Sequence, residues 1–147
     1  LYTGGHADNP EFFDLLQQND AHVVSDNTGF GTRAADVLIR EDGEPLEAII
    51  DYYFEEKPAA TRQMGTQVER MERLLDLVKQ YKADGVVASR LYMCDLWAFE
   101  HFLMRKRLHE NNVPFLELEV DYTPEGQGQI KTRVQAFVES LADRQTA

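Results

Sequence analysis

Cysteine is nearly absent from this chain: Cys94 is the single cysteine among 147 residues. A lone cysteine excludes a disulfide within the chain, and it excludes a metal site built from several cysteines of this chain alone. Any chemical role for Cys94 therefore requires ligands or reactants from elsewhere.

Long apolar runs and excess positive charge are also lacking. No run of about 18 apolar residues, the length of a membrane-spanning helix, occurs, and the opening LYTGGHADNPEFF has no signal-peptide features. Fifteen Lys and Arg face 26 Asp and Glu, for a net charge of -11, which repels phosphate backbones and anionic lipid. We expect a soluble, cytoplasmic protein that binds neither nucleic acid nor membrane.

Two widespread catalytic motifs are missing as well. The four histidines give no H-E-x-x-H or other metal spacing, and G-x-S-x-G does not occur. His101 and His109 fall on one predicted helix, where packing or solvated positions are the better interpretation.

What the sequence does contain is an alternation of apolar strands with amphipathic helices. Strands are predicted near residues 1–3, 22–25, 86–88 and 115–120. Helices are predicted from Asn9-Pro10 to about Asn19, from Pro45 to Phe54, from Gly65 to Lys82, from Leu96 to Asn112, and after Gly128. Right-handed crossovers then give an α/β fold of three layers, α/β/α, with about four parallel strands, flavodoxin-like or Rossmann-like. The cluster Tyr52-Tyr53-Phe54 at the end of one helix is predicted to be a core or interface feature.

Ligands of such sheets bind beyond the carboxyl ends of the strands. The informative loops are therefore residues 4–8, 26–33, 89–95 and 121–132. Cys94 lies a few residues beyond the strand at 86–88, at the start of a helix whose dipole would favour a thiolate. Two interpretations stay open: a small buried apolar residue, or a metal ligand.

Two glycine-containing segments could hold an anion. The stretch from Thr28 to Arg33 is either part of a phosphate-cradling loop or a plain turn, since a complete dinucleotide fingerprint is missing. In the segment 126–133, Lys131 and Arg133 could meet phosphate or carboxylate at a helix start. The alternative is a helix N-terminus in which Arg133 bridges to Glu119 or Asp121.

Several blocks taken together carry a family resemblance. They are Asp84-Gly85-Val86-Val87, Cys94, the segment 113–121, and residues 128–139, which follow the specific pattern G-Q-x-x-T-R-x-x-A-F-x-E. The first half adds a glycine turn, Asn9-Pro10, Val23-Val24-Ser25-Asp26 and Gly31-Thr32-Arg33. On these residues the chain resembles the 2-hydroxyacyl-CoA dehydratase and benzoyl-CoA reductase family over nearly its whole length.

The resemblance implies a heteromeric enzyme of anaerobic metabolism. In this family an ATP-dependent iron–sulfur activator protein supplies low-potential electrons to a cysteine-ligated [4Fe–4S] cluster, which reduces an acyl-CoA thioester. In the dehydratases, which are lyases, a ketyl radical then expels the hydroxyl group, whereas in the benzoyl-CoA reductases the aromatic ring is reduced. The implied partners are a homologous second subunit, the activator and the acyl-CoA substrate.

The resemblance assigns a role to one residue, because Cys94 matches the cluster cysteine of the C-terminal domain. The other candidates come from their positions in this sequence and not from the family match: Ser89 and Arg90 could lie around the cluster, and Lys131 or Arg133 could anchor coenzyme A. Because the chain opens inside a strand, we interpret residues 1–147 as a single C-terminal α/β domain of a larger subunit, whose missing N-terminal part supplies the other ligands. The isolated chain is then expected to hold no cluster and to be inactive.

A different class of function stays open beside this one. A flavodoxin-like or receiver-like binding or docking module shares the same fold without chemistry of its own. A receiver requires acidic residues at the end of its first strand, and here that strand ends in Thr3-Gly4-Gly5.

Overall fold

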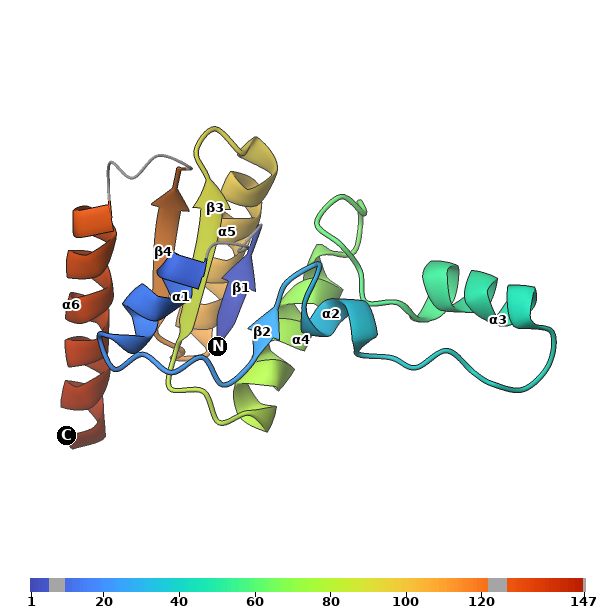
Figure 1. Ribbon diagram of the computed structural model, residues 1–147, viewed down its shortest axis with the longest axis horizontal. Coiled ribbons are helices and arrows are strands. Elements are labelled where there is room, and N and C mark those ends of the chain that lie inside the picture. Colours follow the sequence, from blue (N-terminus) through green and yellow to red (C-terminus); the bar gives the residue numbers. More distant parts are fainter. Residues whose placement is uncertain (6–9, 122–126, 147) are drawn as a thin grey trace.

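The computed structural model describes residues 1–5, 10–121 and 127–146 (Figure 1). Its strands are β1 (Tyr2–Gly4), β2 (Asp26–Asn27), β3 (Val86–Leu91) and β4 (Phe115–Val120). Its helices are α1 (Pro10–Gln17), α2 (Thr32–Ala35), α3 (Pro45–Asp51), α4 (Gln67–Gln80), α5 (Asp95–Glu110) and α6 (Gln127–Thr146), and a π-helical turn, η1 (Tyr52–Glu56), continues α3. No helix in these ranges is long and apolar enough to cross a bilayer.

The four strands form one parallel sheet, as predicted, and the structure shows their order to be β2-β1-β3-β4. Pairing is most extensive between the two longest strands, where Val86 to Leu91 lie opposite Phe115 to Val120. Strand β1 joins this pair to β2 by pairing with both neighbours. The central position of β1 and β3 explains why their residues are the most completely buried of the sheet.

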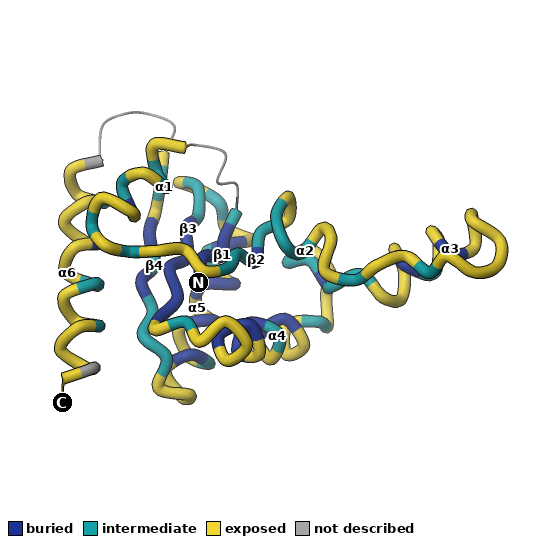
Figure 2. The backbone as a smooth tube through the Cα atoms, turned by 60° about the horizontal axis from the view of Figure 1, so that its bottom comes forward, coloured by how far each residue is buried: buried dark blue, intermediate teal, exposed yellow. Residues whose placement is uncertain are grey.

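Both faces of the sheet are covered, which confirms the predicted three layers (Figure 2). Side chains alternate along β3, so Val86 and Ala88 face α4 and α5 whereas Val87 faces α1 and α6. The first face is filled mainly by Met71, Leu74, Leu75, Val78, Trp97, Met104 and Leu108. The second is filled mainly by Tyr2, Leu16, Leu116, Leu118 and Val134.

The strand predicted at residues 22–25 is wrong by several residues. Val23 and Val24 are 37% and 51% exposed, and pairing with β1 occurs at Asp26 and Asn27. The Ser25 carbonyl accepts a hydrogen bond of 3.0 Å from the Tyr2 amide, which marks the beginning of this pairing. The β-branched side chains of Val23 and Val24 suggested a buried strand. At the edge of the sheet, however, a residue belongs to the strand only where its backbone pairs with β1, and this pairing begins after Val24. The stretch predicted as a loop at 26–33 accordingly contains β2 and most of the first turn of α2.

Residues 37–58 form an arm that extends away from the sheet and its covering helices (Figure 1). The arm carries the predicted helix at Pro45–Phe54, which the structure divides into α3 and η1. Glu44 caps α3, because its carboxylate accepts a 2.9 Å hydrogen bond from the Glu47 amide, and Pro45 occupies the first helical position. These local signals fix where the helix begins, and contacts from Tyr52 to the Ala34 carbonyl and from Asp51 to Arg40 help to hold it.

A buried ion pair connects α4, α5 and the base of the arm. Arg70 of α4 donates from Nε and Nη2 to the two carboxylate oxygens of Glu100 of α5, at 2.7 and 2.8 Å. Its Nη1 donates to the carbonyl oxygens of Ala60 and Gln63, both at 3.2 Å, and to Thr66 Oγ1 at 2.5 Å. Since both side chains are less than one-tenth exposed, each charge depends on the other for compensation.

Replacing Glu100 by alanine should lower the free energy of unfolding by about 3–5 kcal/mol, because it leaves the Arg70 charge buried without a partner. The matched control is Glu72→Ala, since Glu72 of α4 pairs with Arg107 of α5 in an exposed salt bridge across the same two helices. That pair is screened by water and salt, so its loss should change stability little. Urea unfolding of both variants measures the difference, and equal midpoints for the two would contradict the importance of the buried pair.

Candidate functional site

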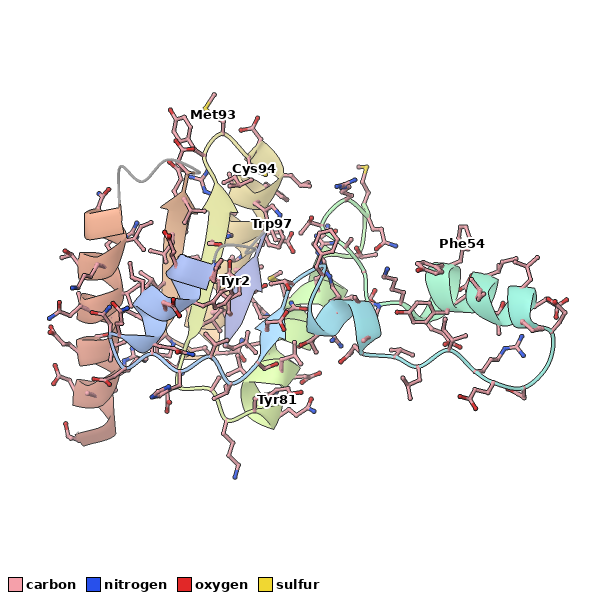
Figure 3. The ribbon with its side chains drawn as sticks, viewed as in Figure 1. Tyr2, Phe54, Tyr81, Met93, Cys94 and Trp97 are labelled. Atoms are coloured by element: carbon pink, nitrogen blue, oxygen red, sulfur yellow. The ribbon has the colours of Figure 1, made fainter. Side chains whose placement is uncertain are left out.

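Cys94 lies at the carboxyl edge of the sheet, just beyond the central strand β3 (Figure 3). It is the N-cap residue of α5, with extended backbone angles of φ -87° and ψ 90°. Its amide donates to the Leu91 carbonyl at 3.1 Å, and its carbonyl accepts from the Ala98 amide at 2.9 Å. The position expected for Cys94 from the strand–loop–helix order is thus the one observed.

The turn before Cys94 is sharp and its side chains point outward. Met93 has a left-handed φ of 63°, which a non-glycine residue adopts only at some cost in energy. The Tyr92 amide donates to the Val120 carbonyl at 2.9 Å, so the turn is fixed to the end of β4. Tyr92 and Met93 are exposed. This geometry places Cys94 near the surface. The ends of β3 and β4 lie on one side of it, and the first turn of α5 lies on the other.

The thiol of Cys94 is half-buried and free, and it packs beside the core that contains Trp97. It is therefore neither enclosed in the core nor fully in solvent. The described residues bring together no group of three or more histidine, cysteine or carboxylate side chains that could hold a metal ion. A metal centre at this position would take one ligand from this part of the chain. A soft thiolate donor at a helix N-terminus fits that single contribution.

Ser89 and Arg90 extend to opposite faces of the sheet, and each is engaged with other residues. The Ser89 hydroxyl is buried and forms a very short hydrogen bond with the hydroxyl of Tyr2. Burial raises the pKa of that Tyr2 phenol to about 12. Arg90 pairs instead with Glu117 and Glu119 of β4. No hydrogen bond or ion pair among the described residues joins either side chain to Cys94.

Arg90 belongs to a charged cluster between β4 and α5. Glu117 lies at its centre, 3.6 Å from Arg90 Nε and 3.4 Å from His101 Nδ1, and it also pairs with Arg105. Burial would raise the pKa of Glu117, but the hydrogen bond from Arg105 and the neighbouring charges lower it overall. Glu117 therefore stays ionised and neutralises the cations around it.

His101 is completely buried in this cluster, which confirms a packing position. Its ring makes edge contacts with Trp97 and Phe115, at centroid distances of 6.0 and 6.2 Å. Neither ring nitrogen forms a hydrogen bond among the described residues, and burial lowers the pKa of His101 although Glu117 opposes this. His101 is thus held in its neutral form. His109 is exposed at the far end of the same helix.

The glycine loop after β2 does cradle an anion, but the anion is a side chain of the protein itself. Asp26 accepts hydrogen bonds from the amide and hydroxyl of Thr28 at 2.9 and 2.7 Å. It also accepts from the amide and hydroxyl of Thr32, at 3.2 and 2.8 Å. Burial would raise the Asp26 pKa, but these four donors lower it. The plain-turn interpretation therefore describes this loop better than a phosphate-binding one.

Lys131 and Arg133 are exposed on α6. Lys131 borders a surface depression whose other residues include Glu11 and Asp14, and acidic neighbours disfavour an anionic ligand. Glu119 pairs with Arg90, and no ion pair between Glu119 and Arg133 occurs in the described part of the chain; the alternative bridge from Arg133 to Asp121 stays a prediction. The predicted segments at residues 6–8 and 122–126, including Gly126, lie outside the described residues.

Comparison with known proteins identifies the family of this chain. A family model described as 2-hydroxyglutaryl-CoA dehydratase, D-component, matches residues 1–141. The chain belongs to this dehydratase family. The match confirms the resemblance drawn from the blocks around Cys94 and from the pattern in residues 128–139.

Individual dehydratase relatives are similar at moderate identity. A putative dehydratase subunit, YjiM, of Escherichia coli K12 is 28% identical over 127 residues, which are 86% of this chain and 32% of that protein. The (R)-phenyllactyl-CoA dehydratase beta subunit of Clostridium sporogenes is 25% identical, over 96% of this chain and 37% of its own length. The lactoyl-CoA dehydratase subunit beta of Anaerotignum propionicum is 28% identical, over 96% and 38%. The chain thus spans about a third of the length of these relatives.

Sequence reasoning missed the buried Arg70–Glu100 pair and the partly buried cradle around Asp26. Arg70 stands beside Met71 and one turn before Leu74, and Glu100 one turn before Met104, so both charges are in register with apolar helix faces. A charged residue in an apolar stripe signals a buried pair, and that signal was available. The Asp26 cradle could have been found from Asp26, Thr28 and Thr32, which match a side-chain turn around a carboxylate.

Gly31→Ala should lower the free energy of unfolding by about 1 kcal/mol, since partly buried donors of Thr28 and Thr32 would lose their acceptor. A Cβ atom at Gly31 would lie 2.0 Å from Asp26 Oδ1, which forces the carboxylate out of its cradle. The control is Gly29→Ala in the same loop, where the nearest atom is the flexible end of Arg33 at 3.1 Å. Thermal unfolding of Gly31→Ala and Gly29→Ala measures the difference in stability. An equal loss of stability in both variants would contradict this role of the cradle.

His101→Gln should make stability less dependent on pH between about 5 and 6.5, the range of histidine titration. The folded protein holds His101 neutral with a lowered pKa, so the unfolded chain binds a proton more readily and stability falls as pH drops below about 6.5. Unfolding free energies measured at several pH values should show a shallower decline for the variant. His109→Gln, on the exposed end of α5, should leave the wild-type slope in place, and an unchanged slope in His101→Gln would count against the buried neutral imidazole.

Proposed function

We propose that this chain forms the cluster-binding edge of a 2-hydroxyacyl-CoA dehydratase subunit, with Cys94 as one thiolate ligand of a [4Fe–4S] cluster. The observation that carries the proposal is the position of the thiol: half-exposed, at the N-terminus of α5 and beyond the central strand β3, in a member of a dehydratase family. Other ligands would come from the remainder of a larger subunit. The relatives named above are dehydratase subunits, which favours dehydration over reduction of benzoyl-CoA.

The cluster would supply the low-potential electron that an acyl-CoA thioester requires. The residues of this chain would contribute a fixed ligand and a controlled environment. The hydrogen bonds of the Cys94 backbone to Leu91 and Ala98 would hold the ligand at one place. The exposed Tyr92 and Met93 would help to exclude water once the rest of the subunit covers this edge.

The proposed partners follow from the same family membership. Two relatives carry the designation of a beta subunit, which supports pairing with a homologous second subunit. An ATP-dependent iron–sulfur activator protein and an acyl-CoA substrate complete the proposed system. Ser89 and Arg90 would act through the sheet, since Ser89 fixes Tyr2 and Arg90 fixes β4. Lys131 and Arg133 stay proposed contacts for coenzyme A.

Cys94→Ala in the subunit that carries this chain, produced anaerobically with its partner and activator, should lose most of its cluster iron and nearly all dehydration activity. The fold should persist, because Cys94 is only half-buried and caps α5 through its backbone. Iron analysis, cluster absorption and circular dichroism measure these three effects. His109→Gln, on the exposed far end of α5, is the control and should keep both iron and activity.

The chain of residues 1–147 alone provides a second control. With one cysteine it should bind no stoichiometric iron–sulfur cluster, because such clusters normally take four cysteine ligands. Full iron content and activity in Cys94→Ala would remove Cys94 from the ligand set. Stoichiometric cluster absorption from the isolated chain would show that the ligands are organised differently.

A further inference from the structure

A small cavity lies between α2, α4 and α5, near the carboxyl ends of β1 and β2. The volume open to the centre of a water molecule is about 10 Å³, which is room for one water molecule or for one oxygen atom of a larger group. Thr3 of β1 and Asn27 of β2 border the cavity on the side of the sheet. Since parallel sheets bind ligands beyond the carboxyl ends of their strands, the cavity lies where a ligand is expected.

The lining of this cavity has an excess of positive charge. Three cations and one anion contribute to it: Arg33 of α2, Arg70 and Arg73 of α4, and Glu100 of α5. Arg70 neutralises Glu100, and all three of its guanidinium nitrogens already donate hydrogen bonds. Arg73 pairs with Asp36 at 2.5 Å. Arg33 is the remaining cation, and within residues 1–5, 10–121 and 127–146 it forms no hydrogen bond or ion pair.

The acid that follows β1 in the sheet does not fill this role for Arg33. Asp26 attracts Arg33, but its two oxygens already accept hydrogen bonds from the amides and hydroxyls of Thr28 and Thr32. Burial and the charges of the two neighbouring arginines lower the pKa of Arg33. A guanidinium nevertheless keeps its proton in a protein. Arg33 is therefore a half-buried charge without a hydrogen-bonded counter-ion in the described part of the chain.

Two buried polar groups at the cavity lack partners as well. Asn27 is only 7% exposed, and its Oδ1 has no hydrogen-bond partner among the described residues. The same is true of the buried Nε of Arg73. Because buried polar atoms are nearly always hydrogen-bonded, these atoms indicate that something occupies the cavity. Asn27 can offer it either end of its amide, since a half-turn of the side chain exchanges oxygen and nitrogen.

The combination of free donors favours an oxyanion over a water molecule. One water molecule would satisfy Asn27 and Arg73 but would leave the charge of Arg33 uncompensated. An oxyanion has several acceptor oxygens, so one can enter the cavity while a second meets Arg33. Arg33 is only half-buried, which leaves room for the remainder of the ligand at the surface. The planar fork of an arginine suits the paired oxygens of carboxylate and phosphate groups.

We propose that this cavity binds one oxygen of a small carboxylate or phosphate group, which Arg33, Arg73 and the amide of Asn27 hold together. The site is separate from the glycine loop, whose donors Asp26 occupies. It is also separate from Cys94, which does not line the cavity. The inference therefore goes beyond the proposed function and does not depend on an iron–sulfur cluster.

Equilibrium dialysis of the subunit that carries this chain, against labelled acetate and labelled inorganic phosphate, tests the site. Wild type should bind one equivalent of anion that Arg33→Gln loses, with an affinity at least about tenfold weaker in the variant. Arg62→Gln is the matched control, because Arg62 is an exposed arginine beside Thr61 that does not line the cavity. It should bind as the wild type does, and circular dichroism confirms that each variant is folded.

A second variant fills the site with a charge of the protein itself. Asn27→Asp replaces the amide by a carboxylate of nearly the same shape, close to Arg33 and Arg73. This internal anion should exclude acetate and phosphate without removing either arginine. Gln67→Glu adds the same charge at an exposed position of α4, and it should leave anion binding unchanged.

The outcomes are distinct. One equivalent that disappears in Arg33→Gln and in Asn27→Asp, and persists in both controls, supports the site. Equal binding by all variants places the anion elsewhere and overturns it. A wild type that binds neither anion at millimolar concentration leaves the cavity to water and overturns it too. Chloride that competes as well as acetate overturns the choice of an oxyanion. None of these results bears on the dehydratase proposal, because none measures cluster iron or dehydration.

Discussion

The bidentate pair between Arg70 and Glu100 is the contact on which most of the architecture depends. It joins α4 to α5 on one face of the sheet and, through the third nitrogen of the guanidinium, holds the segment that returns from the arm. A buried pair of this kind need not add much net stability compared with apolar residues. It does fix direction, because a planar guanidinium meets a carboxylate in one orientation. The helices, and with them the start of α5 at Cys94, are therefore set in one register.

Two polar clusters lie on the face of the sheet that α5 covers, and their charges are neutralised in different ways. Arg70 pairs with a single carboxylate, that of Glu100. Around Glu117, one carboxylate faces Arg90, Arg105 and a neutral His101. The carboxyl edge of β3 and β4 is thus fixed by ion pairs immediately beneath the turn that presents Cys94. Such support holds in place a short turn whose backbone at Met93 is in a left-handed conformation.

Periodicity predicted the parallel sheet, the three layers and the long helices because these depend on apolar patterns that continue for many residues. It failed at residues 22–25, where Val23 and Val24 have strand-forming side chains but lie outside the pairing range of β1. The position of Cys94 followed from strand order, whereas the partners of Ser89 and Arg90 did not. Those partners, Tyr2 and Glu119, are distant in sequence, and only the packed sheet brings them together. The anion of the glycine loop was likewise unexpected, because spacing alone does not distinguish a cradle for phosphate from one for Asp26.

The arm helix has a buried inner flank and an exposed outer flank, and this has a consequence for related chains. Ala48 and Tyr52 constrain the inner flank, so changes there disturb folding. The outer residues from Leu46 to Phe54 touch no part of the core, and substitutions among them leave the free energy of the sheet nearly unaltered. Related chains with different outer residues on this helix would therefore keep the same sheet and the same turn at Cys94, because neither depends on that flank for its packing.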